Sequence, residues 1–321
     1  MGTVLAAMLG QIGLPGGGIG FGYSAVNAIG MATEHLSWPS LSQGPNPVDD
    51  FIPVARIADM LLNPGDTIDY NGRRVTFPDT RLVYWAGGNP FHHHQDLNRL
   101  VKAWRAPDTT ICNEIWWNPL ARHCDIVLPA TTTLERNDFS GSSREGSLFA
   151  MHKAVDPVGQ GRCDFDIFSG LAERLGATES FTEGRDEAAW LRHLYDRGRQ
   201  RASEKGVEMP DFDAFWENGR FDLDAPTSAQ IFLAGFRGDP ERQPLKTPTG
   251  KIEIFSETID GFGYDDCPGH PVWMEPAEWL GASTAKRFPL HMISSQPAHR
   301  LHSQYDNGSV SRSTKVAGRE A

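Results

Sequence analysis

Apolar residues between positions 81 and 138 alternate between the spacing of strands and the spacing of a helix. Residues 81–86, 109–113 and 125–129 are short runs rich in β-branched and aromatic residues, and each run predicts a strand. Between the first two runs, the apolar residues from 97 to 104 share one face of a predicted helix. A strand, a glycine turn, a helix and a strand in this order indicate a parallel nucleotide-binding sheet, which holds ligands at the carboxyl ends of its strands.

Outside this segment the same two patterns predict further elements. Helices are expected at residues 4–14, 53–62, 166–175 and 186–200. Strands are expected in a hairpin at residues 69–77 and singly at residues 251–255 and 288–294. The first helix is apolar along its length, so we expect it to be buried. Together these patterns predict a protein of the α/β class.

Length and charge narrow the class of protein. The chain has 321 residues, of which 39% are hydrophobic, so it can bury a large core, and its length suggests two domains. The net charge of −11 and the lack of a lysine or arginine run argue against a nucleic-acid partner, because phosphates demand basic patches. No stretch of about 18 apolar residues is present, so the sequence predicts no membrane span.

Metal-binding patterns are weak. The four cysteines show no CxxC pairing, so neither an iron–sulfur cluster nor a structural zinc ion is supported. His92, His93 and His94 are consecutive and therefore point in different directions on a helix. Hydrogen bonding at a helix start is favoured over metal ligation for them, and we assign no metal ligand.

Polar residues follow the predicted strands where a ligand would bind. The turn at residues 87–90 (Gly-Gly-Asn-Pro) ends the first strand but lacks the spacing of GxGxxG, so a tight turn without a ligand is an equally good interpretation. Glu114 closes the second strand, where such folds place a carboxylate that accepts hydrogen bonds from a ribose or a base. Arg136 and Arg300 stand in polar stretches and suit a pyrophosphate or a pterin, with a solvated loop as the alternative.

Five stretches of the sequence together resemble one family. They are LAAMLGQIGLPGGGIGFGY, VYWAGGNPFHHHQDLNRL, EIWWNPLARHCDIVLPATTTLERND, TPTGKIEIFSETI and SSQPAHRLHSQYDN, in this order along nearly the whole chain. The chain thereby resembles the dimethyl sulfoxide reductase family of molybdopterin oxidoreductases. Within it, the chain is similar to the subgroup that reduces S- and N-oxides: dimethyl sulfoxide, trimethylamine N-oxide and biotin sulfoxide reductases.

The resemblance implies three regions. Residues 1–175 would form a Rossmann-like region that binds molybdopterin guanine dinucleotide. Residues 176–287 would be its helical and loop-rich continuation, and residues 288–321 the truncated start of a C-terminal β-barrel domain that also binds the dinucleotide. Family members run to roughly twice this length. We therefore expect an internal fragment, inactive alone, that lacks the molybdenum-ligating serine and exposes apolar residues such as Trp116 and Trp117.

The resemblance also implies a cofactor and the residues that contact it. The family binds two molybdopterin guanine dinucleotides around one molybdenum. The positions that match the family's cofactor contacts are Asn89, His93, Asn113, Glu114, Arg136, Asp166, Ser294, Ser295, Gln296, Pro297, Arg300, His302, Ser303 and Gln304. No catalytic residue is assigned within this chain.

The implied function is oxidoreduction as part of a longer enzyme. The whole enzyme would remove an oxygen atom from a small sulfoxide or amine N-oxide in a two-electron reduction, with electrons from a donor of unknown identity. Its compartment, periplasm or cytoplasm, is left open because an export signal would lie upstream. The alternative is a non-catalytic nucleotide-binding or scaffold protein, since no serine here matches the metal-ligand motif.

Overall fold

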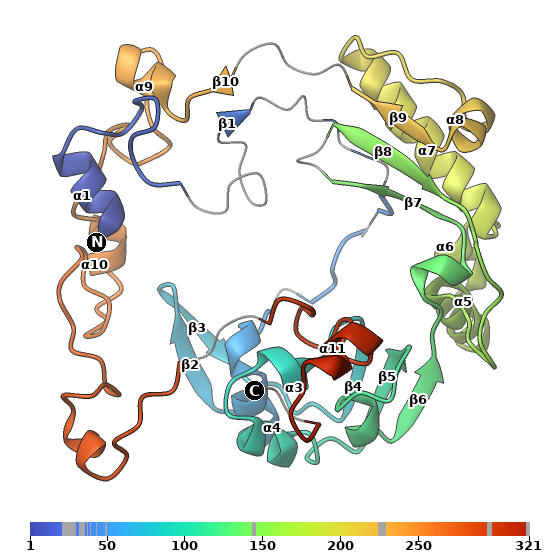
Figure 1. The fold of residues 1–321 in the computed structure, drawn as a ribbon, viewed down its shortest axis with the longest axis horizontal. Coiled ribbons are helices and arrows are strands. Elements are labelled where there is room, and N and C mark those ends of the chain that lie inside the picture. The colour runs from blue at the N-terminus through green and yellow to red at the C-terminus, as the bar shows by residue number, and fades with distance from the viewer. Residues whose placement is uncertain are drawn as a thin grey trace. The chain divides into compact units, whose positions relative to one another are not determined.

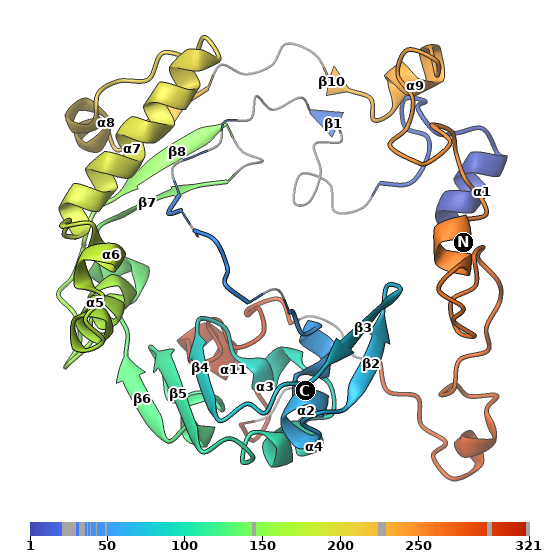
Figure 2. The same ribbon diagram turned by 180° about the vertical axis from the view of Figure 1, so that it is seen from behind.

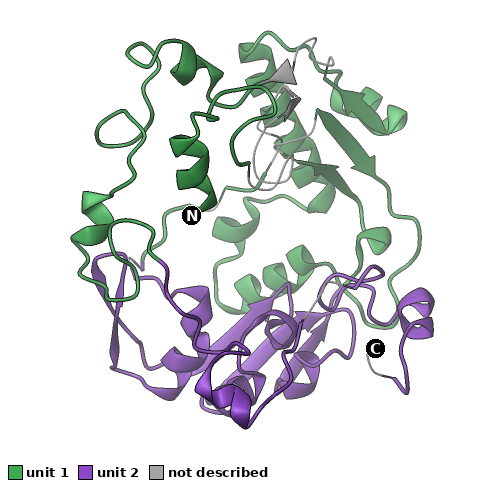
Figure 3. Ribbon diagram, turned by 60° about the vertical axis from the view of Figure 1, so that its left-hand side comes forward, with its two compact units in different colours: residues 1–47, 131–272 green, residues 48–130, 273–321 purple. Residues whose placement is uncertain are grey.

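The computed structural model contains two compact units, each assembled from two separate stretches of sequence (Figure 3). Unit 1 consists of Met1–Pro47 and Thr131–Val272, and unit 2 consists of Val48–Ala130 and Trp273–Ala321. The structure describes residues 1–20, 30–31, 36, 38, 40–42, 44–48, 50–142, 146–223, 229–293 and 297–318. The predicted division at residues 175 and 287 stays a prediction.

The centre of unit 2 is a parallel sheet (Figure 1). Its strands, in spatial order, are β4 (Leu82–Ala86), β5 (Thr109–Glu114) and β6 (Ile126–Pro129). Ala86 lies opposite Asn113, and Glu114 lies opposite Pro129, so the carboxyl ends of the three strands form one edge. The three predicted strands, their adjacency and the α/β class are therefore confirmed.

Short helices and a hairpin complete unit 2 (Figure 2). They are η1 (Val54–Arg56), α2 (Ile57–Leu62), β2 (Thr67–Tyr70), β3 (Arg73–Thr76), α3 (Pro90–His93), α4 (Leu97–Ala103), η2 (Ala121–His123), η4 (Ser283–Lys286) and α11 (Ser309–Ser313). The apolar face of α4 packs on β5, where Leu100, Trp104 and Cys112 are buried in one cluster. The predicted helices after positions 53 and 97 are confirmed, and their apolar residues contribute to this core. The predicted hairpin is confirmed by the pairing of β2 with β3.

Unit 1 is built on an antiparallel sheet with helices. The sheet order is β7 (Asp138–Gly141), β8 (Ser147–Met151) and β9 (Arg220–Asp222). The main helices are α5 (Asp164–Arg174), α6 (Thr178–Thr182), α7 (Glu187–Glu204) and α8 (Phe212–Asn218). Leu148 of β8 packs with Tyr195 of α7 and Phe215 of α8 in one buried cluster. The helices predicted near residues 166 and 186 are thus confirmed.

The remaining elements of unit 1 are short. They are α1 (Gly2–Met8), β1 (Gly30–Met31), η3 (Thr133–Glu135), β10 (Ala229–Gln230), α9 (Ala234–Gly238) and α10 (Glu257–Asp260). The expectation of a long buried first helix is wrong. α1 ends before Gly10, which adopts a φ of 64°, and Leu5 is 57% exposed. Among the described residues, no helix is long and apolar enough to cross a membrane.

Two predicted strands are absent from the described part of the chain. Residues 251–255 are bends and irregular backbone; the Thr247 hydroxyl donates to Lys251 O, and the Glu253 carboxylate accepts from Thr249 N. Residues 288–293 have no strand partner, and Leu290 is 90% exposed. A strand needs a neighbour for its backbone hydrogen bonds, so this segment stays irregular. The described residues contain no closed barrel, and the β-barrel domain stays a prediction.

Candidate functional site

The turn after β4 combines glycines that have open space beside them with a polar side chain, Asn89. Gly87 and Gly88 have φ angles of 82° and 77°, a region that favours glycine, and a Cβ on Gly87 would meet no atom within 4 Å. Asn89 caps α3, since its Oδ1 accepts from Phe91 N at 3.1 Å. Its Nδ2 is buried and finds no acceptor among the described residues. Buried donors are nearly always paired, so this amide has a hydrogen bond available for a ligand or a water molecule at the strand end.

The end of β5 presents an oriented amide. Asn113 is buried, and its Oδ1 accepts a hydrogen bond of 2.8 Å from the hydroxyl of Tyr84 on β4. Because the hydroxyl occupies the carbonyl oxygen, the orientation of the Asn113 amide is fixed by the neighbouring strand. The sheet thus brings Asn89 and Asn113 to the same edge, as predicted.

Glu114, the last residue of β5, has a carboxylate that is held at both oxygens. Oε1 accepts from Ile115 N at 2.9 Å, and Oε2 accepts from Asn118 Nδ2 at 2.6 Å. A carboxylate has about four acceptor positions, so two remain for a ligand. Trp116 and Trp117 are 55% and 67% exposed beside it, which confirms their predicted exposure.

The C-terminal stretch of unit 2 meets this edge at a pair of histidines. The rings of His93 and His302 lie 5.5 Å apart. Partial burial, and then the neighbouring His302 and His92, hold the pKa of His93 below its ordinary value of 6.5, which favours the neutral imidazole. The structure therefore brings together two predicted residues from distant parts of the sequence.

Arg300 is fixed within the same stretch. Its guanidinium donates to His302 O and forms an ion pair of 3.4 Å with Asp306. Ser303 and Gln304 continue a tight turn, in which Gln304 N donates to Leu301 O at 2.8 Å. Pro297 is half-buried at the start of the described stretch. Ser294, Ser295 and Gln296 lie outside the described residues.

Arg136 and Asp166 belong to unit 1, so the predicted set is divided between the units. Arg136 donates to Thr131 O at 3.3 Å and to the Asp138 carboxylate at 3.2 Å. Asp166 is exposed in the first turn of α5, where a negative charge is favourable, and its N–H contacts Cys163 Sγ at 3.4 Å. Their predicted contacts with the cofactor stay predictions.

Glu135 organises the turn that carries Arg136. Its carboxylate accepts from Thr132 N at 2.7 Å, from Thr132 Oγ1 at 2.8 Å and from Val158 N at 2.7 Å. These hydrogen bonds, those from Thr132 first, hold the pKa of Glu135 below its ordinary value of 4.5. A charged acceptor thus locks the η3 turn directly before Arg136.

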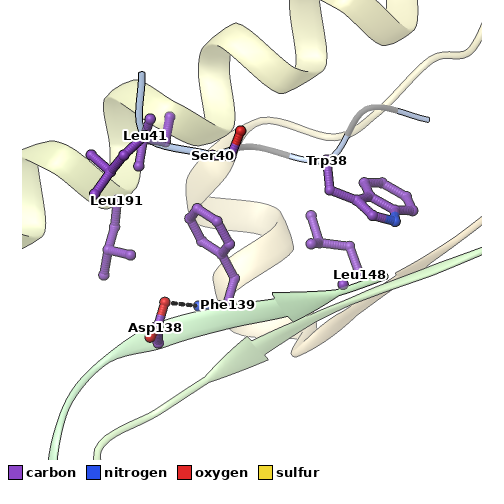
Figure 4. Close-up of a pocket in the computed structure, with 9 residues that line it drawn as sticks. Trp38, Ser40, Leu41, Asp138, Phe139, Leu148 and Leu191 are labelled. Atoms are coloured by element: carbon purple, nitrogen blue, oxygen red, sulfur yellow. Dashed lines mark hydrogen bonds between the residues drawn. The ribbon is translucent and has the colours of Figure 1, made fainter. Parts of the chain in front are cut away.

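A separate hollow of about 230 Å³ lies in unit 1 (Figure 4). Trp38, Phe139, Leu148 and Leu191 are among the apolar residues that line it. The carboxylate of Asp138 at its edge accepts a hydrogen bond from Phe139 N at 2.9 Å. The lining contains none of the predicted cofactor residues, so this hollow is not the candidate site. Among the described residues, no group of three or more His, Cys, Asp or Glu side chains is arranged to hold a metal ion.

Sequence reasoning missed two residues of the strand edge, Tyr84 and Asn118. Asn118 had a usable signal, because it precedes Pro119 in an Asn-Pro pair typical of a turn start. Tyr84 had none, since its role depends on the register that places β4 beside β5. Both residues act through a neighbour rather than by a motif of their own.

Comparisons with known proteins show the family of the chain. The family model for molybdopterin oxidoreductases matches residues 1–174. The chain is 49% identical to a biotin sulfoxide reductase of Cereibacter sphaeroides over 98% of its length, which covers 42% of that protein. It is also 49% identical to a dimethyl sulfoxide/trimethylamine N-oxide reductase of Rhodobacter capsulatus, over 97% of this chain and 39% of that protein.

Two further comparisons extend this likeness. The chain is 46% identical to a trimethylamine-N-oxide reductase of Haemophilus influenzae, over 99% of this chain and 40% of that protein. It therefore spans about two fifths of the length of these relatives. Its fold is similar to that of acetylene hydratase from Pelobacter acetylenicus, with a TM-score of 0.53 and 21% identity, over 74% of this chain and 30% of that one.

Proposed function

Because the chain belongs to the molybdopterin oxidoreductase family, we propose that it is part of a molybdenum-dependent reductase of sulfoxides or amine N-oxides. The similarity of the chain to biotin sulfoxide, dimethyl sulfoxide and trimethylamine N-oxide reductases supports this substrate class. The cofactor in this proposal is bis-molybdopterin guanine dinucleotide with one molybdenum. An electron donor outside this chain completes the reaction.

The residues at the strand edge of unit 2 fit such a cofactor. The observation that carries the proposal is the buried Asn89 Nδ2 without an acceptor among the described residues, next to the open face of Gly87. Glu114 adds a carboxylate with free acceptor positions on the next strand. An amide donor, open backbone and a carboxylate at the ends of parallel strands suit the sugar, phosphates and base of a nucleotide.

The chain's own residues bind and orient the cofactor in this proposal. Asn89, Asn113 and Glu114 hold the nucleotide end, and Arg300 binds phosphate or pterin oxygens, which guanidinium contacts in pairs. His93 and His302, with His93 neutral, offer a ring nitrogen that accepts a hydrogen bond. When bound, the molybdenum–pterin group supplies the two-electron oxygen-transfer chemistry.

Other predicted contacts complete the proposal in two groups. Arg136 and Asp166 bind further parts of the cofactor from unit 1. The pterin is enclosed by the C-terminal contacts Ser294, Ser295, Gln296, Pro297, Ser303 and Gln304. Hydroxyl and amide groups, together with the charged side chains of Arg136 and Asp166, suit pterin edges and phosphates, which need several directed hydrogen bonds.

The test uses the cofactor-loaded enzyme that contains this chain. Glu114→Ala and Arg300→Ala each remove a charge-assisted hydrogen bond of about 1.5 to 3 kcal/mol, so each should weaken cofactor retention by about one to two orders of magnitude. Molybdenum and guanine nucleotide content are measured beside sulfoxide reduction. Arg300→Ala should also lower turnover per bound molybdenum, whereas Glu114→Ala should change retention alone.

Two outcomes would count against the proposal. Wild-type metal content and activity in both variants would remove these residues from the cofactor site. A wild-type protein that holds a guanine nucleotide, but neither contains molybdenum nor reduces a sulfoxide or N-oxide, would favour the non-catalytic alternative.

A further inference from the structure

The loop after β5 contains a side chain that reaches back to Glu114. Asn118 Nδ2 donates to Glu114 Oε2 at 2.6 Å, while Asn118 Oδ1 accepts from Ala121 N at 3.0 Å. One amide thus connects the carboxylate to the first turn of η2. We propose that Asn118 is a positioning residue that holds the Glu114 carboxylate in the orientation in which it binds the sugar or base of the nucleotide. This inference rests on the proposed function.

The base of this connection is rigid. Ala121 and Leu120 are buried in the core of unit 2, so the backbone that anchors Asn118 is fixed by packing. Arg122 Nε donates to Trp117 O at 3.0 Å, which closes the loop on its outer side. The side-chain amide of Asn118 therefore links the packed core to the strand edge.

Holding Glu114 in place affects binding through conformational entropy. A glutamate side chain has several rotatable bonds, and a ligand that must immobilise it loses affinity. The bond from Asn118 and the bond from Ile115 N together fix the plane of the carboxylate before a ligand arrives. Its remaining acceptor positions are then held in fixed directions, which favours a base whose donors match them.

Two substitutions separate the two bonds of Asn118. Asn118→Ser keeps an acceptor for Ala121 N, since serine caps a helical turn as well as asparagine, but its side chain is too short to reach Glu114. Asn118→Asp also keeps the acceptor and places a second carboxylate against Glu114 in place of the donor. Asn98→Asp, on the exposed side of α4, adds the same charge elsewhere in unit 2 and is the matched control.

The measurement follows guanosine monophosphate released by acid hydrolysis, per chain, after timed dialysis of the cofactor-loaded enzyme. Asn118→Ser should lose the nucleotide about tenfold faster than wild type, and Asn118→Asp faster still, with Asn98→Asp unchanged. Hydrogen exchange of the Ile115 amide should quicken in both Asn118 variants. The thermal midpoint of Asn118→Ser should stay at the wild-type value because the cap is kept.

A reversed pair distinguishes positioning from a purely structural role. Glu114→Gln/Asn118→Asp restores a hydrogen bond between the two side chains but moves the charge to position 118. Slow exchange at Ile115 with fast nucleotide loss supports the inference, and recovered nucleotide retention overturns it. Wild-type retention in Asn118→Ser also overturns it and leaves the proposed function standing, whereas a wild-type enzyme without guanine nucleotide overturns both.

Discussion

Similar polar side chains make different kinds of contact in the antiparallel region of unit 1 and at the parallel sheet of unit 2. In unit 1, Tyr195 is fully buried, and its hydroxyl donates to Pro210 O at 2.9 Å, so the bond closes the core on itself. In unit 2, the Tyr84 hydroxyl donates to Asn113 at the strand edge. Nearby, Asn89 leaves a buried donor for which the described residues provide no acceptor.

This difference contrasts a core that satisfies its own polar groups with an edge that carries the proposed cofactor contacts. The cluster of unit 1 combines three aromatic side chains, Tyr195, Phe212 and Phe215, with ring centroids between 4.7 and 5.6 Å from Tyr195. Such packing contributes to stability and requires no ligand. At the edge of unit 2, Asn89 Nδ2 has no acceptor among the described residues, and a buried donor without a partner costs free energy.

The largest expected effect concerns the aromatic cluster. Phe215→Ala should lower the free energy of unfolding by about 3 to 5 kcal/mol, because a fully buried aromatic side chain is replaced by a cavity. Urea unfolding measures the loss, and hydrogen exchange locates it. Protection should fall in α7, α8 and β8, and an equal fall in β4–β6 would show that the two cores are not separate.

The tyrosine pair gives the next largest effect. Tyr195→Phe should destabilise the chain by about 2 kcal/mol, since it leaves Pro210 O without its donor. Tyr84→Phe should cost less than about 1 kcal/mol, because the Tyr84 side chain is only partly buried whereas Tyr195 is fully buried, yet it should impair nucleotide retention. Equal losses of stability in urea titrations of the two variants would contradict the comparison.

Backbone conformation at the strand edge gives a smaller effect. Gly87→Ala should cost about 1 kcal/mol, because alanine is strained at a φ of 82° even though the space around a Cβ is open. Gly146→Ala in unit 1 is the control, since its φ lies outside that region and the nearest atom is 3.5 Å away. Thermal midpoints of the two variants should differ in this order, and a neutral Gly87→Ala would show that the turn relaxes.

The smallest effects appear in the pH dependence of stability. The pKa of His93 is lowered by burial in the folded chain, so its contribution is present above pH 6.5 and is lost as the pH falls below that value. The pKa of Glu135 is lowered by hydrogen bonds, so its contribution is present above pH 4.5 and is lost at more acidic pH. Unfolding midpoints measured between pH 3 and pH 8 should show both slopes in wild type, whereas His93→Gln should lack the first and Glu135→Gln the second.

The sequence predicted the parallel sheet because its signals are local. Residues 82–86, 109–114 and 126–129 combine strand composition with a glycine turn and a helical face, and each pattern is complete within a few residues. Residues 251–255 and 288–293 failed for the opposite reason. Their alternation was correct for a strand, but a strand also needs a neighbour, and sequence does not reveal its absence.

The candidate site shows the same limit. Glu114 was predicted because it directly ends a strand, whereas the contact of Asn118 with that carboxylate is seen only in the structure. His93 and His302 were each predicted from a motif, but their contact depends on the fold. Local sequence patterns predict single site residues, whereas contacts between residues that are distant in sequence are seen only in the folded structure.

Because unit 2 is built from two separate stretches of the chain, its two parts are synthesised at different times. The chain completes β6 and then builds Thr131–Val272 of unit 1 before it returns to unit 2. At a synthesis rate of about 5 to 20 residues per second, this detour lasts on the order of ten to thirty seconds. For that interval a nascent sheet displays Asn89 and Glu114 while His302 does not yet exist. The strand edge is therefore made first, and the segment that meets it arrives last.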